Sequence, residues 1–289
     1  MCELFSISSR LPTRTTFSLH TFASHGAPGR SAVDGWGIAF FDGPDVRVYK
    51  EPEPAGDSAW LAFVEGQRLA CRLIVSHIRR ATTGAISLAN TQPYVRELGG
   101  RMHVFAHNGR LDAITSCNDA AQLRFHPVGT TDSEMAFCLL LQRLLPLWSV
   151  ATVPRLADRL SIVAGFAREM REFGPANFLY GDSDALFAHG HRRMQSNGTI
   201  APPGLWILQR ECTVDPEGLA QSGVTLQAFG DSQKIVLLAS VPLSSERWRS
   251  LDEGEVIAIK DGRVVSREPP DRKASSLAKP IMARREPSI

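Results

Sequence analysis

The sequence lacks the features that would direct the protein into a membrane or out of the cell. No uncharged apolar run approaches the roughly 18 residues that a membrane-spanning helix needs. The apolar stretch at residues 235–245 is shorter than that and contains Pro242. No basic segment precedes an apolar core at the N-terminus, so a signal peptide is not expected. Position 2 is cysteine where N-myristoylation needs glycine, which excludes that modification.

Cysteine pairing and excess charge are also missing. The chain has 5 cysteines, an odd number, and none has C-x-x-C spacing, so neither a disulfide framework nor a zinc site is expected. A reduced, cytoplasmic protein is the default interpretation. The formal net charge of +2 over 289 residues points to no nucleic-acid or membrane partner. The length allows one large domain or two modest ones.

The order of the expected elements indicates the fold class. Strand-like runs occupy most of the chain, beginning with residues 2–8, and short helices are expected at 15–25 and 57–70. Thr131 and Glu134 form a capping box before an apolar run, which predicts a helix, and apolar spacing predicts another at 153–173. Two consecutive helices between strands favour an α+β layered fold with antiparallel sheets.

Four short fragments carry residues that could do chemistry, and each also has a structural explanation. Cys2 could be a small buried side chain. Arg79 at a strand end could be solvated, and Asn108-Gly109 is a common hairpin turn. Asp132 could simply cap a helix. Each fragment alone favours the structural explanation.

The fragments together describe a reactive centre. Removal of Met1 would leave Cys2 with a thiol and a free α-amine. Because an α-amine has a reference pKa of about 7.7–8.0, part of it is a neutral base near pH 7 and can activate the thiol. Asn108 and Gly109 offer N–H donors for an oxyanion. Arg79 can grip a carboxylate and Asp132 an ammonium, and free glutamine carries both groups.

These fragments resemble class II (N-terminal nucleophile) glutamine amidotransferase domains. The matching motifs are Cys2, H-x-R-x-A-T at 77–82, H-N-G at 107–109 and T-D-S-E at 131–134. The segments DGWGIAFF (34–41) and NTQPY (90–94), and a closing pattern from Ala239 to Glu255, are also similar, so the resemblance spans roughly residues 2–267.

The resemblance implies a four-layer αββα sandwich of the N-terminal nucleophile hydrolase type. It implies that Cys2 is nucleophile and base, and that no metal or organic cofactor is needed. Asn108 and Gly109 would form the oxyanion hole, and further residues would bind substrate or support the site. These further residues are Arg79 and Asp132 at the two ends of glutamine, Thr82 at the carboxylate, His77 as a brace, and Trp36, which either lines the pocket or packs.

Some positions depart from the family pattern. Arg80 and Thr83 stand where large fused members have Trp and His, and Gln92 replaces the His of N-x-H-P. No second domain follows, so we expect one stand-alone domain at 2–267 and a flexible tail at 268–289, which contains 4 prolines.

Three functional hypotheses remain open at this stage. The first is hydrolysis of the glutamine side-chain amide, with a separate enzyme accepting the ammonia. The second is hydrolysis of another γ-glutamyl amide, such as a γ-glutamyl peptide or a thiol-metabolite precursor. The third is a catalytically idle interaction module that retains Met1. A homo-oligomer is compatible with all three.

Overall fold

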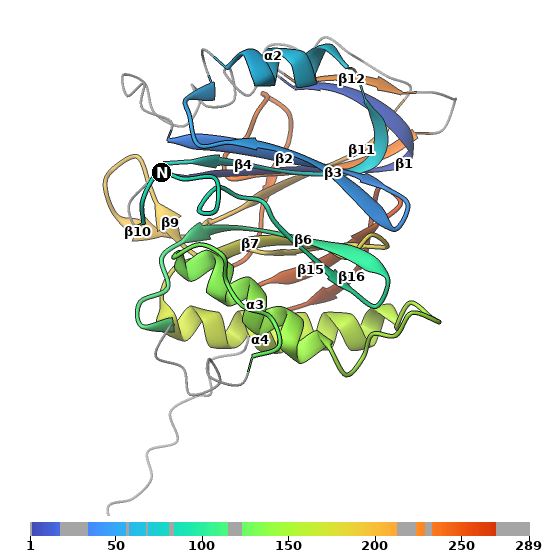
Figure 1. Cartoon of the computed structure of the whole chain (residues 1–289). Helices are drawn as coiled ribbons and strands as arrows, with labels where there is room; N and C mark the ends of the chain where they lie inside the picture. Colours follow the sequence, from blue (N-terminus) through green and yellow to red (C-terminus); the bar gives the residue numbers. More distant parts are fainter. Residues whose placement is uncertain are drawn as a thin grey trace, which may run out of the picture.

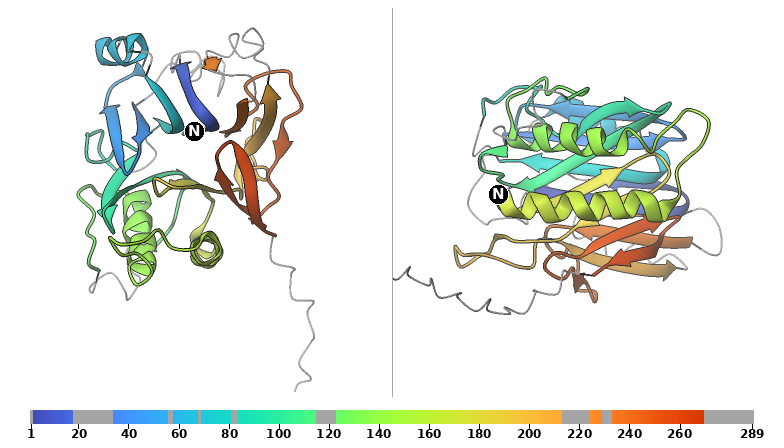
Figure 2. Two further views of the ribbon diagram at one scale, coloured as in Figure 1. Left: turned by 90° about the vertical axis from the view of Figure 1, so that its right-hand side faces the viewer. Right: turned by 90° about the horizontal axis from the view of Figure 1, so that it is seen from below.

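The computed structural model describes residues 2–17, 34–55, 58–67, 69–80, 84–114, 123–212, 224–228 and 233–269. Two antiparallel sheets lie face to face in this part of the chain (Figure 1). Helix α2 (Ala59–Gly66) covers one outer face, and α3 (Asp132–Leu144) and α4 (Leu156–Phe173) cover the other (Figure 2). This is the expected four-layer αββα sandwich.

The first sheet contains the start of the chain at its centre. Its strand order is β14 (Arg249–Ser250), β11 (Trp206–Cys212), β13 (Gln233–Ala239), β1 (Glu3–Phe17), β4 (Ala70–Arg79), β2 (Gly35–Asp42) and β3 (Asp45–Glu51), with β12 (Val224–Ala228) also paired to β1. The second sheet runs β16 (Arg263–Glu268), β15 (Val256–Lys260), β8 (Leu186–His189), β7 (Ala176–Gly181), β6 (Arg101–Gly109) and β5 (Tyr94–Leu98). A separate pair, β9 (Arg193–Met194) and β10 (Ile200–Ala201), lies near the N-terminus (Figure 1).

Three apolar clusters hold the four layers together, and alternation along the strands creates them. Leu4 and Val75 belong to the cluster between the sheets. Phe5, the next residue of β1, belongs to the cluster beneath α2. Phe105 and Phe137 stack in the third cluster, between the second sheet and α3 and α4. Strand β1 is therefore buried on both faces. Its first residues are held by packing against the second sheet on one face and against the cluster beneath α2 on the other.

Most of the expected elements are present, and some expectations were wrong. Thr131 caps α3 by accepting from the Glu134 backbone N–H at 3.2 Å, as the sequence motif predicted. The helix expected at 15–25 does not begin there, because β1 extends to Phe17; the remainder lies outside the described residues. Strands β5, β9, β10 and β14 were not anticipated. The tail expected at 268–289 lies outside the described residues from 270 onward.

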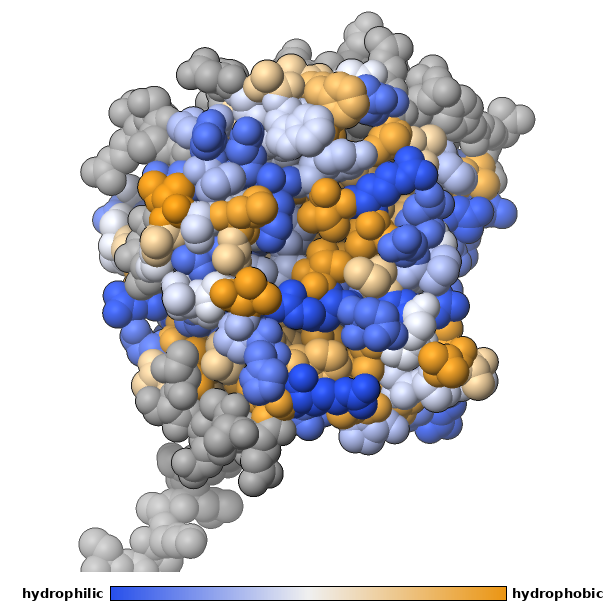
Figure 3. Space-filling view, viewed as in Figure 1, coloured by the Kyte–Doolittle hydropathy of each residue, from blue (hydrophilic) through white to orange (hydrophobic). Residues whose placement is uncertain are grey.

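In the described part of the chain, no helix has the length and apolarity required to span a membrane. The face of the molecule turned to the viewer in Figure 1 mixes apolar with charged side chains (Figure 3).

We expect stability to fall in mild acid because buried histidines must be neutral in the folded state. Burial lowers the pKa of His77 to about 3, of His103 to about 4 and of His189 to about 3. In the unfolded chain these histidines protonate near pH 6.5. The free energy of unfolding is therefore highest above pH 6.5 and decreases as the pH falls below that value. Urea unfolding between pH 7 and 5 should show the decline, at most about 1.4 kcal/mol per pH unit for each histidine. A flat profile would contradict this expectation.

Candidate active site

The ends of four elements, β1, β4, β6 and α3, meet at one edge of the sandwich. Strand β1 begins beside the end of β4, because Leu4 pairs with His77. The end of β6 and the N-terminus of α3 face the same point. They enclose a small cavity of about 30 Å³. Its lining consists of Cys2, Arg79, Arg80, Asn90, Gln92, His107, Gly109, Thr131, Asp132 and Ser133. Four of these residues are predicted site residues: Cys2, Arg79, Gly109 and Asp132.

The thiol of Cys2 lies against the end of β4. Its Sγ accepts from the Arg80 backbone N–H at 3.3 Å and lies 3.4 Å from the Arg80 carbonyl oxygen. Burial raises the pKa of the Cys2 thiol above its ordinary value, and the hydrogen bond to the Arg80 backbone opposes that rise. A thiol in this setting needs a base before it can act as a nucleophile.

Asn108 links the second sheet to the first residue of β1. Its Nδ2 donates to the Cys2 carbonyl oxygen at 2.7 Å and, at a longer 3.4 Å, to the hydroxyl of Ser240. Its own carbonyl accepts from the Asn177 side chain at 2.9 Å. The side-chain amide is therefore fixed beside Cys2, and the longer bond to Ser240 is the weaker of its two interactions.

Gly109 occupies a position where no side chain fits. A Cβ there would lie 1.7 Å from the Pro175 carbonyl oxygen and 2.7 Å from Nε2 of His107. Asn108-Gly109 does not form a hairpin turn: β6 pairs with β7, so Gly109 is opposite Ala176. The dipeptide instead ends a strand at the cavity. Glycine is required at position 109 because the backbone of Pro175 approaches it closely.

A cation and an anion border the cavity from opposite elements. Arg79, buried at the end of β4, donates from Nη2 to the carbonyl oxygens of Gly84 at 3.2 Å and Ala85 at 3.1 Å. Asp132 is half-buried at the first position of α3 and accepts from the backbone N–H groups of Leu111 at 2.7 Å and Ser133 at 2.8 Å. The structure thus brings together Cys2, Arg79, Asn108, Gly109 and Asp132.

Three other predicted site residues are placed differently. Thr82 lies outside the described residues. His77 is fully buried in β4 and does not line the cavity. Trp36 is also fully buried, in the cluster beneath α2, and its Nε1 donates to Glu51 at 3.2 Å. Of the two possibilities for Trp36, the structure places it in packing.

Several residues of the site were not assigned roles from the sequence. Gln92 accepts from the His107 backbone N–H at 2.6 Å and donates to its carbonyl oxygen at 3.2 Å. The ring of His107 pairs through Nδ1 with the Ser133 hydroxyl at 2.9 Å. Asn90 joins the Ala85 carbonyl to the backbone N–H of Thr130. The NTQPY, HNG and TDSE motifs contain these residues, but the sequence does not show which of them form hydrogen bonds with one another.

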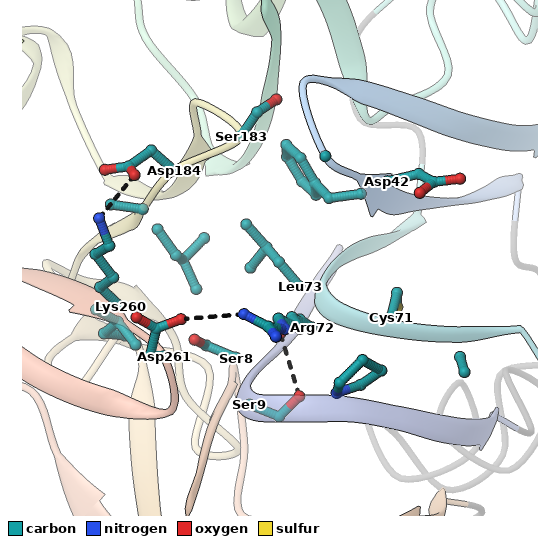
Figure 4. A pocket seen from close by; sticks show the side chains of 17 residues that line it. Ser8, Ser9, Asp42, Cys71, Arg72, Leu73, Ser183, Asp184, Lys260 and Asp261 are labelled. Carbon is teal, nitrogen blue, oxygen red and sulfur yellow. Dashed lines mark hydrogen bonds and ion pairs between the residues drawn. The ribbon is translucent and has the colours of Figure 1, made fainter. Parts of the chain in front are cut away.

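A larger cavity lies elsewhere in the described part of the chain. It has a volume of about 550 Å³ and is formed by β1, the start of β4 and three strand-connecting turns (Figure 4). Four of its charged side chains form two ion pairs: Lys260 with Asp184 at 2.7 Å and Arg72 with Asp261 at 3.9 Å. Its one thiol, Cys71, is buried, which raises the pKa of that group to about 12. The cavity therefore offers no activated nucleophile.

Comparison with known proteins assigns the family. The family model for class-II glutamine amidotransferases matches residues 1–282. The chain belongs to this family. It is 32% identical over 257 residues to YafJ of Escherichia coli (strain K12), provisionally named a glutamine amidotransferase; the match covers 88% of this chain and 96% of YafJ.

Two further comparisons involve a solved structure and a second curated relative. The crystal structure of a predicted glutamine amidotransferase from Pseudomonas aeruginosa PA01 superposes with a TM-score of 0.68 at 29% identity, covering 91% of this chain and 99% of that one. The γ-glutamyl-hercynylcysteine sulfoxide hydrolase of Mycobacterium tuberculosis is 34% identical over 97 residues, which is 32% of this chain and 39% of that protein.

Replacing Gly109 should disrupt the cavity. We expect Gly109→Ala to lower the free energy of unfolding by about 1–3 kcal/mol, because its Cβ would overlap the Pro175 carbonyl. Gly165→Ala is the matched control: it lies within α4, and its Cβ would meet no atom within 4 Å. Denaturant unfolding should therefore show the Gly165 variant to be at least as stable as the parent. Equal stability of the Gly109 variant would show that the close approach is not required.

Proposed function

We propose that this class-II glutamine amidotransferase hydrolyses the side-chain amide of glutamine through Cys2, after removal of Met1. The observation that carries the proposal is the convergence of the Cys2 thiol, Gly109, the Arg79 guanidinium and the Asp132 carboxylate on one small cavity. The Asn108 side-chain amide lies beside them, hydrogen-bonded to the Cys2 carbonyl. No single fragment of the sequence would justify it.

The reaction begins with proton transfer from the Cys2 thiol to the freed α-amine. The resulting thiolate attacks the amide carbon and forms a C–S bond. The oxyanion accepts from Asn108 and from the Gly109 backbone; Asn108 can provide this donor by exchanging its 3.4 Å bond to Ser240. The α-ammonium then returns its proton to the departing nitrogen, and ammonia leaves. Water hydrolyses the γ-glutamyl thioester, restoring the thiol and releasing glutamate.

The α-substituents of the substrate select for an amino acid. Arg79 would hold the α-carboxylate with charge-assisted hydrogen bonds, and Thr82 would assist it. Asp132 would accept from the α-ammonium through lone pairs that its two backbone donors leave available. Asn90 supports both substrate-binding residues. Its side chain donates to the Ala85 carbonyl, which also accepts from Arg79, and it accepts from the Thr130 backbone N–H, two residues before Asp132.

The proposed reaction requires a reduced cysteine. A reduced, cytoplasmic location would keep Cys2 as a thiol. We further propose that residues 2–267 form the catalytic unit.

Removing the nucleophile gives the direct test. Cys2→Ala should reduce amide hydrolysis by at least about 10⁴-fold while leaving thermal stability nearly unchanged. Glutamate release and a thermal melt measure the two effects. Cys71→Ala is the control, since that thiol is in the large cavity and should not affect turnover per folded molecule.

The mass of the intact protein tests activation separately. Loss of one methionine is expected, because only then is the α-amine of Cys2 free. A retained Met1 would leave no free base on Cys2 and would favour the interaction-module hypothesis.

A second candidate function is hydrolysis of a larger γ-glutamyl amide. The similarity to γ-glutamyl-hercynylcysteine sulfoxide hydrolase favours it, since that protein's name specifies such a substrate. The chemistry at Cys2 would be identical, and only the leaving group would differ. We expect kcat/KM for glutamine to exceed that for γ-glutamyl amides of increasing size. A preference for a larger amide would instead select the second function.

A further inference from the structure

A buried ion pair stands immediately behind the nucleophile. Glu3, the first residue of β1, is 1% exposed, and its Oε1 accepts from Nη2 of Arg193 at 2.8 Å. Arg193 belongs to the small β9–β10 pair and also donates to the carbonyl oxygen of Ser240. Ser240 in turn receives the Asn108 amide and the Leu4 backbone N–H. The ion pair is thus connected to the groups that fix Cys2.

One oxygen of this carboxylate has no hydrogen-bond partner. Oε2 of Glu3 is buried and unpaired among the described residues, although Oε1 is paired with Arg193. Burying an unsatisfied carboxylate oxygen costs folding free energy, and such atoms in native structures call for an explanation. Burial raises the pKa of the Glu3 carboxyl, and the Arg193 guanidinium and, to a smaller extent, the nearby Ser240 hydroxyl oppose that rise. The Ser240 hydroxyl does not lie within hydrogen-bond geometry of Oε2. A second donor would satisfy the free oxygen.

Removal of Met1 would create a donor in the right place along the chain. Successive side chains of a strand point to opposite faces, so the Cys2 thiol and the Glu3 carboxylate lie on opposite faces of β1. The backbone nitrogen of Cys2 belongs to the residue that immediately precedes β1, one position before Glu3 in the chain. In the mature protein that nitrogen carries up to three hydrogens, enough to face both the thiol and a carboxylate.

We propose that Glu3 is the positioning residue for the α-amine of mature Cys2, accepting a hydrogen bond from it through Oε2. The thiol, the amine and the carboxylate then form a nucleophile, a base and an orienting group drawn from two consecutive residues. This follows the general arrangement of a base held by a third group. Arg193 fixes the carboxylate and keeps it from turning away. The inference rests on the proposed function for its role in turnover.

Other charged groups also lie near the start of β1. Arg79 ends β4 and Arg80 follows it, Arg193 lies on β9, and Asp132 begins α3. Arg79 contacts the Gly84 and Ala85 carbonyls, and Asp132 accepts from two backbone N–H groups. His107 on β6 is buried, which lowers its pKa, so it stays neutral. Of the buried carboxylates, Glu3 is the one adjacent to Cys2 in the chain.

The first experiment measures the α-amine without any substrate. In mature Cys2→Ala protein, where the amine titrates without the thiol, its pKa is obtained from pH-dependent acetylation followed by mass spectrometry. Adding Glu3→Gln should lower that pKa by about one unit or more, because loss of a nearby negative charge disfavours the ammonium. An unchanged pKa would overturn the proposal.

A matched control separates this effect from general damage. Asp182→Asn removes the carboxylate of another buried ion pair, in which Arg159 donates to Asp182 at 2.7 Å beneath α4. Asp182→Asn should destabilise the fold about as much as Glu3→Gln does, but leave the α-amine pKa unchanged. Equal shifts in both variants would mean that Glu3 acts only on stability.

Kinetics and structure complete the test. In the otherwise unaltered enzyme, Glu3→Gln should lower kcat for amide hydrolysis about 10-fold and move the acidic limb of the kcat profile to lower pH. If that variant does not fold, a crystal structure of the mature parent decides: Oε2 should lie within about 3.2 Å of the α-nitrogen, and a separation beyond about 4 Å would overturn the proposal. Because the amine titration needs no substrate, failure of glutamine hydrolysis alone would not affect it.

Discussion

The hydrogen bond from Asn108 Nδ2 to the Cys2 carbonyl oxygen joins the two sheets where the chain begins. Chain termini are usually poorly ordered unless other contacts hold them. Here the first residues of β1 are held by β4 on one side and by the segment after β13 on the other, while Asn108 reaches them from the opposite sheet. A reactive group on the second residue is useful only with such restraint, since a nucleophile must be held near its target.

The packing of the sandwich explains why the site is at this edge. Antiparallel pairing brings the beginning of β1 to the end of β4, so Cys2 and Arg79 become neighbours although 77 positions separate them. The second sheet then presents the end of β6, with Asn108 and Gly109. At the other end of the same strands lies the larger cavity, in which Lys260 pairs with Asp184 and the cysteine has a raised pKa. Cavity size alone would therefore point to a different location from the one that the sequence motifs indicate.

The sequence predicted the α3 cap and most strands because these depend on local spacing. It could not locate β5, β9, β10 or β14, which are short and depend on distant partners. Motif order in the sequence singled out five residues that the fold brings together, including Asn108 and Gly109. The roles of Gln92 and Asn90 were hidden because each acts by hydrogen-bonding to backbone brought close only by the fold. Trp36 shows the converse: its motif resembles the family's, but alternation along β2 directs its side chain to the cluster beneath α2.

The free oxygen of Glu3 connects folding to activation. Before methionine is removed, the nitrogen of Cys2 is an amide and has a single hydrogen. Afterwards it is an amine that can face both a thiol and a carboxylate. A buried carboxylate with one oxygen paired and one unpaired is a poor choice for stability alone, because an apolar residue at that position would avoid the desolvation cost. The presence of this carboxylate beside Cys2 is better explained by a hydrogen-bond donor that exists only in the mature chain. Cleavage of one peptide bond would then complete both the base and its support.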